Sequence, residues 1–145
     1  YAKRMDKRLP AAEALLRRII AALGAVAPGL ADRPIHGAPH LHQWLLGDEG
    51  LALVDFDRFG LGDPELDAAT FLAEADFEHG FDGIGEAYVA GFAGEHALNP
   101  RLLEAYRLHK HVAKAERLLG AVRLDAAERA LALLGQVAEN AEKLP

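Results

Sequence analysis

Histidine, amide and carboxylate side chains gather in residues 36–57, a stretch that has the pattern of a β-hairpin. Short apolar runs flank the turn at residues 47–50, which consists of glycines and acids, and this composition is typical of a hairpin. Because a short hairpin brings its outer ends together, we expect Gln43 and Asp55 to lie close in space. An amide oxygen and a carboxylate that meet in this way suit a hard cation such as Mg²⁺.

Other ligands and another metal remain open at this corner. Asp57 is a candidate second carboxylate ligand, with a solvated loop acid as the alternative. For Gln43, the alternative to a metal ligand is an amide that stabilises the hairpin. Zinc is the alternative metal, because imidazole and carboxylate are both zinc ligands. The histidines concerned are His36, His40 and His42. Their spacing on a loop fixes no single coordination geometry, so the sequence favours Mg²⁺ over zinc.

The bulk composition indicates a globular protein with a hydrophobic core. The chain has 145 residues, of which 51% are apolar and 26% charged, enough for one ordinary domain. Its formal net charge of -6 argues against nucleic acid or an anionic membrane as the main partner. Cysteine is absent, which excludes disulfides and thiolate metal sites and favours a cytoplasmic setting. No apolar run approaches the ~18 residues needed to span a membrane.

Hydrophobic periodicity and cap residues predict five helices in addition to the hairpin. Residues 1–9 are basic, and we expect them to fray or to join an upstream segment. The predicted helices run from Pro10 to about residue 23, from Pro64 after the cap Asp63, from Ile84 to about Gly94, from Pro100 after the cap Asn99, and from the cap Asp125 to about Leu144.

The hairpin is the only extended structure that we expect. Residues 30–35 are assigned to a linker and residues 58–62 to a loop rich in turn residues. A lone hairpin is marginally stable in water unless helices pack on it, so we assign the large aromatic residues to the core. These residues are Trp44, Phe56, Tyr88, Phe92 and Tyr106.

Several motifs of this region occur in the order and spacing of one enzyme family. His36-Gly37 opens a loop with His40 as its second histidine, residues 54–57 read Val-Asp-Phe-Asp, and residues 62–67 read Gly-Asp-Pro-Glu-Leu-Asp. Over residues 34–75 this arrangement resembles the C-terminal lobe of the aminoglycoside phosphotransferase and choline kinase family, which is related to protein kinases. The loop of that family reads His-Gly-Asp-x-His-x-x-Asn, and the segment after its hairpin binds metal.

The resemblance implies an α+β fold, mainly α, in which residues 1–145 form a single helical lobe of a protein-kinase-like fold with one small β-hairpin. Residues 34–75 would contain the catalytic loop and the metal segment. The sequence shows no glycine-rich nucleotide clamp of the kinase type. We therefore expect the chain to belong to a longer, two-lobed protein, with an N-terminal nucleotide-binding lobe as its partner; the alternative is a protein that lacks a nucleotide clamp altogether.

The function implied by the resemblance is transfer of the terminal phosphate of ATP or GTP to a hydroxyl or amine of a small molecule, with Mg²⁺ as cofactor. Asp55 would be the principal metal ligand and Gln43 the second, since glutamine supplies the same amide oxygen as the family's asparagine. Asp67 would brace the catalytic loop through hydrogen bonds to its backbone. An acidic helix face would suit a cationic substrate, and its members are Asp76, Glu78, Asp82 and Glu86.

One departure from the family pattern concerns the catalytic base. Ala38 stands where the family has the aspartate that accepts the proton of the substrate hydroxyl. A positioned general base contributes roughly 10²–10⁴ in rate, and a methyl group accepts no proton. His40 and Asp57 are the candidate substitutes. The alternative function is a catalytically inactive pseudokinase that serves as a binding or scaffolding module.

Overall fold

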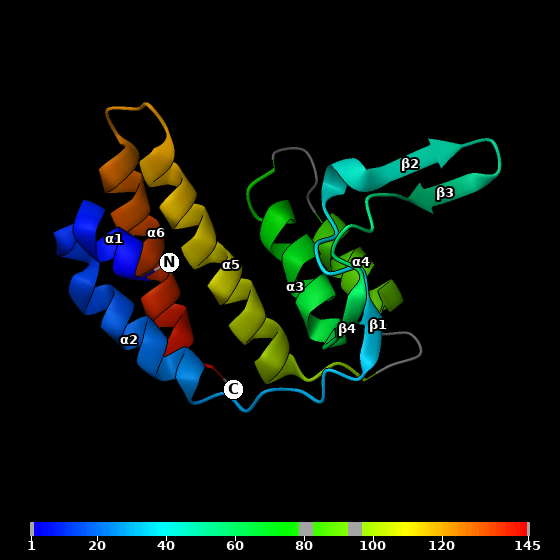
Figure 1. Ribbon diagram of the computed structural model, residues 1–145, viewed down its shortest axis with the longest axis horizontal. Helices are drawn as coiled ribbons and strands as arrows, with labels where there is room; N and C mark the ends of the chain where they lie inside the picture. Colours follow the sequence, from blue (N-terminus) through cyan, green and yellow to red (C-terminus); the bar gives the residue numbers. More distant parts are fainter. Residues whose placement is uncertain (1, 79–82, 93–96, 145) are drawn as a thin grey trace. The chain divides into compact units, whose positions relative to one another are not determined.

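The computed structural model describes residues 2–78, 83–92 and 97–144 (Figure 1). The chain divides into two compact units, residues 1–27 with 108–145, and residues 28–107. Its secondary structure is mainly helical with small antiparallel sheets, which agrees with the predicted α+β, mainly α class. Within the described part of the chain, every helix is too short or too polar to cross a membrane.

The first unit is built from helices around an apolar core. Its elements are α1 (Ala2–Arg8), α2 (Glu13–Gly24), the later part of α5 (Pro100–Gly120) and α6 (Ala126–Ala141). A single 3-10 turn, Pro10–Ala12, leads into α2, with the proline at the first position as predicted. The buried core consists of Met5, Leu9, Ala12, Leu16, Ile19, Leu108, Val112, Ala115, Ala130, Leu134, Val137, Ala138 and Ala141.

The expectation that residues 1–9 would fray is wrong for residues 2–8, which form α1. Met5 is fully buried and Leu9 is 8% exposed, and these two side chains, four residues apart, share one helical face. The Arg8 guanidinium also donates a hydrogen bond to the carbonyl of Leu119. Basic residues flank the apolar pair in the sequence, so the apolar helix face could not be recognised from the sequence pattern.

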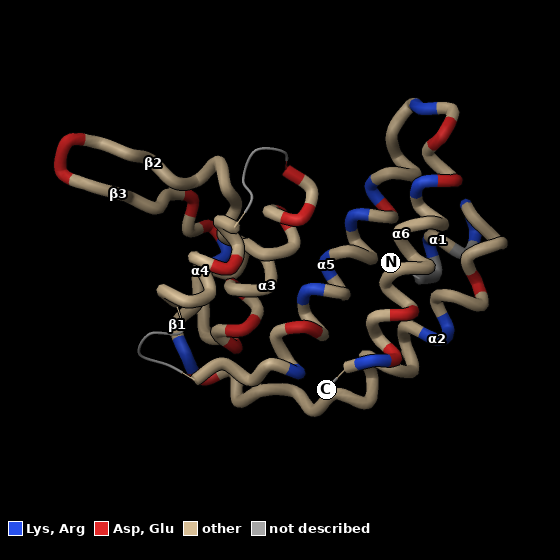
Figure 2. The backbone as a smooth tube through the Cα atoms, turned by 180° about the vertical axis from the view of Figure 1, so that it is seen from behind, with Lys and Arg blue, Asp and Glu red and all other residues tan. Residues whose placement is uncertain are grey.

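The second unit contains all the strands found among the described residues. Along the chain it comprises β1 (Arg33–Ile35), the 3-10 turn Leu41–Gln43, β2 (Trp44–Gly47), β3 (Gly50–Leu53), β4 (Gly60–Gly62), α3 (Pro64–Ala75), α4 (Ile84–Phe92) and the start of α5. The predicted hairpin is confirmed, because β2 and β3 pair antiparallel with Trp44 opposite Leu53 and Gly47 opposite Gly50. Its acidic turn is marked by the red segment at the hairpin tip in Figure 2.

The hairpin is not the only extended structure, contrary to the prediction. β1 pairs antiparallel with β4, with Ile35 opposite Gly60 and Arg33 opposite Gly62, and these are the segments assigned above to a linker and a loop. A Cβ on Gly62 would lie 2.3 Å from the Ile35 side chain. The glycine therefore admits Ile35, which is 8% exposed. Strands of three residues are too short for an alternating pattern to reveal.

Three acidic residues in the first turns of α3 are buried, and each fixes a different segment of this unit. Asp63 accepts hydrogen bonds from the Ala31 amide at 2.8 Å and from the Tyr106 hydroxyl at 2.6 Å. It makes no side-chain cap of α3, so the predicted capping role is wrong. Glu65 accepts the Asn99 amide at 2.8 Å. The third acid, Asp67, belongs to the site described below.

The remaining helices largely follow the prediction. Asn99 caps α5 by accepting the amides of Arg101 and Leu102 at 3.1 and 3.3 Å. Asp125 precedes α6 but makes no side-chain cap, since its carboxylate pairs with Arg123. That helix ends at Ala141, short of the predicted Leu144. The helix predicted from Ile84 is present to Phe92, and residues 93–94 of that prediction lie outside the described residues.

Candidate functional site

Gln43 and Asp55 lie together at the open end of the hairpin, as predicted, but the amide nitrogen of Gln43 faces Asp55 instead of the expected oxygen. The Gln43 Nε2 donates a hydrogen bond to the Asp55 Oδ2 at 2.7 Å. The backbone adds a second link, since the Val54 amide donates to the Gln43 carbonyl at 3.1 Å. Because the strands are joined by a short turn, the pairing of β2 with β3 brings these two side chains together.

The two members of this pair differ in burial and in backbone strain. Gln43 is 9% exposed, and its Oε1 accepts the His40 amide at 2.7 Å. Asp55 is exposed and has a φ of 70°, in the left-handed region that residues other than glycine seldom occupy. Such strain is concentrated at functional sites. The corner thus presents a strained, exposed carboxylate held in place by a buried amide.

The loop before the hairpin is fixed by Asp67, which confirms the predicted brace. The Asp67 carboxylate accepts the His36 amide at 2.6 Å and the Gly37 amide at 2.8 Å, and the residue is 4% exposed. Gly37 has a φ of 87°, and a Cβ there would lie 2.3 Å from the Arg58 carbonyl oxygen. Only glycine fits this turn of the loop.

The His36 ring also connects the loop to the strand end that carries Asp55. Its Nε2 lies 3.0 Å from the Val54 carbonyl oxygen, and since a carbonyl only accepts, Nε2 carries the proton. The ring is 4.5 Å from that of Phe56. The His36 ring therefore holds the loop to the strand end through a backbone group, the Val54 carbonyl, and through a side chain, the Phe56 ring.

Ala38 is half-buried between Gly37 and Pro39, and its methyl group gives the loop no acid or base at this position. His40 has its Nδ1 2.9 Å from the Glu74 Oε1. Because a carboxylate accepts, Nδ1 carries a proton, and in the neutral ring Nε2 is then the acceptor. Sequence reasoning missed Glu74. It lies seven residues after Asp67 on α3, a spacing that places both on one helix face and could have identified it.

The donor set at the corner fits Mg²⁺ better than zinc. Among the described residues, no group of three or more histidine and acidic side chains could hold a metal, so the zinc hypothesis is wrong for that part of the chain. Mg²⁺ is usually bound through one or two carboxylates together with substrate phosphates. Asp55 and Asp57 are both exposed and can supply these carboxylates. The Gln43 oxygen keeps a second lone pair beside the His40 bond.

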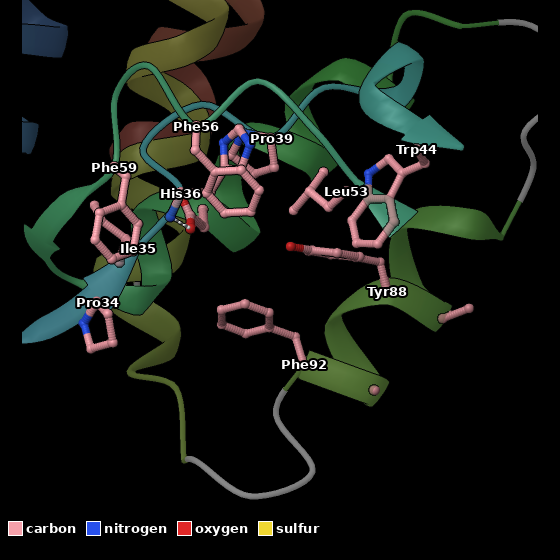
Figure 3. A pocket seen from close by; sticks show the side chains of 13 residues that line it. Pro34, Ile35, His36, Pro39, Trp44, Leu53, Phe56, Phe59, Tyr88 and Phe92 are labelled. Atoms are coloured by element: carbon pink, nitrogen blue, oxygen red, sulfur yellow. Dashed lines mark hydrogen bonds between the residues drawn. The ribbon is translucent and has the colours of Figure 1, made fainter. Parts of the chain in front are cut away.

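A pocket of about 530 Å³ adjoins the loop in the same unit (Figure 3). Its walls are mainly aromatic and aliphatic, and its lining residues are Pro34, Ile35, His36, Pro39, Trp44, Leu53, Phe56, Phe59, Asp67, Ala87, Tyr88, Gly91 and Phe92. Phe56 is 50% exposed, so its assignment to the core is wrong. Trp44, Tyr88 and Phe92 are half-buried pocket residues rather than full core residues.

Two tyrosines of this unit have displaced pKa values. Burial, reinforced by the charge of Asp67, raises the pKa of Tyr88 to about 12. Burial and the hydrogen bond to Asp63 raise the pKa of Tyr106 to about 12. Tyr106 thus has a structural role, although it is half-buried and not the full core residue that was predicted.

The predicted acidic helix face is reduced in charge. Asp76 accepts two hydrogen bonds from the Arg107 guanidinium, one of them at 2.8 Å, and this pairing raises the pKa of Arg107. Glu78 and Glu86 are exposed, while Asp82 lies outside the described residues.

One comparison with known proteins agrees with the family that the motifs predict. A family model described as the phosphotransferase enzyme family matches residues 1–109, a range that contains the loop, the hairpin, the Gln43–Asp55 corner and the Asp67 brace. Searches of curated proteins and of solved structures returned no match to the chain. Because the family model covers well over half of the 145 residues, the chain belongs to the phosphotransferase enzyme family, that of the aminoglycoside phosphotransferases.

Proposed function

We propose that the chain carries the metal and phosphate corner of a small-molecule phosphotransferase. In this proposal, Asp55 is the principal ligand of a Mg²⁺ ion that accompanies ATP or GTP, Gln43 is the second ligand, and Asp57 is an additional one. The observation that carries it is the 2.7 Å contact between Gln43 and Asp55 at the open end of the hairpin. The family's activity gives this corner its chemistry, which is transfer of a phosphoryl group.

The residues of the chain would act here by positioning and by charge. When bound, Mg²⁺ neutralises negative charge on the terminal phosphates. Gln43 would fix the direction of the Asp55 carboxylate, and Asp67 would hold the loop so that the substrate hydroxyl or amine lies near position 38. We also propose a nucleotide-binding lobe as partner, and a cytoplasmic reaction, because that is where nucleoside triphosphates are supplied. An exposed, partly acidic helix face would favour a cationic substrate.

The proton of the substrate would have to be accepted by a side chain other than Ala38. His40 is the candidate, because Glu74 holds its Nδ1 and leaves Nε2 as the acceptor in the neutral ring. The second candidate function is a pseudokinase that keeps the fold and the metal corner as a binding module. Ala38 favours this alternative, since removal of a positioned base costs about 10²–10⁴ in rate.

Metal binding by the chain tests the corner without relying on turnover. Mn²⁺ is a suitable probe, because its paramagnetism reports binding through water-proton relaxation. We expect Asp55→Asn to weaken Mn²⁺ binding by at least about tenfold, the loss of one charged ligand. Asp48→Asn, which removes the same charge from the tip of the same hairpin, is the matched control and should bind like the parent chain. Equal affinities for all three chains would contradict the proposal.

Phosphate transfer then separates the enzyme from the pseudokinase. The substitution Ala38→Asp restores the family's base, and we expect it to raise any transfer rate by about 10²–10⁴. If His40 acts as the base in the parent chain, His40→Gln abolishes the parent's transfer and leaves the rate of Ala38→Asp largely unchanged. A chain that binds Mn²⁺ and nucleotide but transfers no phosphate in either form would be a binding module.

A further inference from the structure

The aromatic pocket next to the loop is separate from the metal corner. Its lining contains His36 and Phe56 but none of Ala38, Gln43, Asp55 and Asp57. The two sites share one loop and one strand end, and each uses different side chains from them. The phosphotransferase chemistry proposed above therefore leaves this pocket without a role.

The walls of the pocket are flat and apolar. Figure 3 shows the rings of Tyr88 and Phe92 on one side of the space, with Phe56 and Leu53 across from them. The Tyr88 and Phe92 rings are stacked, with centroids 5.6 Å apart and an angle of 30°. The Trp44 ring meets Tyr88 edge-on at 6.0 Å. Aromatic faces and edges arranged in this way favour a planar aromatic guest.

Part of this aromatic surface faces water. Phe56 is 50% exposed and Phe59 is 61% exposed, and both line the pocket. Exposed aromatic surface that is gathered in a concave site indicates binding, whereas single exposed apolar residues do not. The volume of about 530 Å³ lies within the range of roughly 300–1,000 Å³ that small-molecule pockets occupy.

The polar groups of the pocket favour a neutral guest. Asp67 is the acid in its lining, but both of its oxygens already accept backbone amides and the residue is 4% exposed. A cation would lose its hydration without gaining a carboxylate oxygen. Figure 3 shows the Tyr88 hydroxyl pointing into the space, and no described residue forms a hydrogen bond with it. With its pKa raised to about 12, this hydroxyl is neutral at pH 7 and can donate or accept one hydrogen bond.

We infer that this pocket binds a flat, neutral aromatic molecule of about two or three fused rings, with one polar group directed at Tyr88. The aromatic side chains supply the contact area and the hydroxyl fixes the orientation of the guest. This site is distinct from the metal corner, and its occupation requires no metal and no nucleotide.

The chain provides its own reporter for this binding. Trp44 is the only tryptophan in the sequence and lies in the pocket wall. The probe is 2-naphthol, whose absorption overlaps tryptophan emission. We expect it to quench Trp44 fluorescence saturably, and decahydro-2-naphthol, of the same skeleton without aromatic rings, to displace it only at concentrations that indicate at least about tenfold weaker binding. The cation trimethylanilinium should bind more weakly than 2-naphthol.

A substitution that fills the pocket makes the test specific. Gly91 lines the pocket, and a Cβ there meets no atom within 4 Å, so the leucine of Gly91→Leu starts in open space and is a better helix former than glycine. The control Ala90→Leu adds a similar side chain at a neighbouring exposed position of α4 that does not line the pocket. We expect Gly91→Leu to weaken 2-naphthol binding by at least about tenfold and Ala90→Leu to leave it unchanged, with equal helicity by circular dichroism.

Three results would overturn the inference of an aromatic guest, and a fourth, with adenosine, would overturn the separateness of the site. The first is the absence of saturable 2-naphthol binding, and the second is equal binding by the decahydro compound or the cation. The third is an equal loss of binding in the two leucine variants. If adenosine quenched Trp44 and lost affinity in Gly91→Leu as 2-naphthol does, the pocket would hold the nucleotide base and would not be a separate site.

Discussion

The two units are stabilised by different physical means. The first unit buries leucine, alanine, valine and methionine side chains in one cluster, and the ion pair Arg18–Glu142 lies on its exposed surface. The second unit buries three acids, Asp63, Glu65 and Asp67, at the start of α3. All three accept backbone amides of other segments.

The difference teaches where positional accuracy comes from. Burial of apolar surface is not directional, so it holds helices together without fixing a loop in one conformation. A buried carboxylate is stable only when its oxygens are satisfied, and each hydrogen bond that satisfies them sets the place of a backbone amide. In the second unit, burial of three acids costs desolvation energy, and the helix dipole offsets part of this cost because it favours negative charge at the helix N-terminus. The hydrogen bonds that these acids accept fix the loop in one conformation.

The strongest way to break this comparison is Asp67→Ala. It leaves the buried amides of His36 and Gly37 without an acceptor, at roughly 1–3 kcal/mol each, so we expect a loss of about 4 kcal/mol in the free energy of unfolding. Urea denaturation measures it. Leu134→Ala, in the core of the first unit, should cost a similar amount, about 3 kcal/mol. Only Asp67→Ala should also weaken Mn²⁺ binding in the folded chain. An equal loss of Mn²⁺ affinity in Leu134→Ala would contradict the role of Asp67 in positioning the loop.

Gly37→Ala tests the geometry of the loop alone. Its φ of 87° and the close approach of the Arg58 carbonyl leave no room for a methyl group, and we expect a loss of about 2–3 kcal/mol in unfolding free energy. Gly47→Ala is the control, because a Cβ at that hairpin position meets no atom within 4 Å. Equal stability of the two variants would mean that the loop relaxes easily.

The hydrogen bond between Tyr106 and Asp63 predicts a specific response to alkaline pH. The folded pKa of Tyr106 is raised from 10.0 to about 12, so its protonated form favours the fold. This stabilisation is complete below the unfolded pKa and is lost as the pH rises from 10 towards 12. Tyr106→Phe should cost about 1 kcal/mol at neutral pH and should flatten the alkaline fall of stability, measured by urea denaturation at several pH values. If the unfolding free energy of Tyr106→Phe fell as steeply at alkaline pH as that of the parent chain, groups other than Tyr106 would cause the fall.

The smallest effect is expected at the surface pair of the first unit. Arg18 and Glu142 lie 2.7 Å apart, with side chains about half exposed, and water and salt screen such pairs. We expect Arg18→Ala to change the melting temperature no more than the scatter between repeats, at low or high salt. If Arg18→Ala lowered stability in a salt-dependent way by as much as Asp67→Ala does, surface ion pairs would stabilise the first unit as strongly as buried acids stabilise the second.

Much of the site could be predicted because its key contacts are local in sequence. Gln43 and Asp55 are separated by only 12 residues, and the turn between them fixes their register. The Asp67 brace followed from the order of the motifs. By contrast, the role of Asp63 was assigned wrongly, because a cap and a long-range anchor have the same sequence signal. Its partners, Ala31 and Tyr106, lie 32 and 43 residues away.

By itself, the sequence determined helices α2 to α6, the hairpin and the meeting of an amide with a carboxylate at its open end. Periodicity, turn residues and motif spacing are properties of neighbouring residues, so they can be recognised without knowledge of distant contacts. Only the tertiary structure decided that β1 pairs with β4, that Glu74 holds His40, and that Phe56 lines a pocket instead of filling a core. Each of these depends on which segments meet across long stretches of chain, and that choice is made by packing and by the need of buried polar groups for partners.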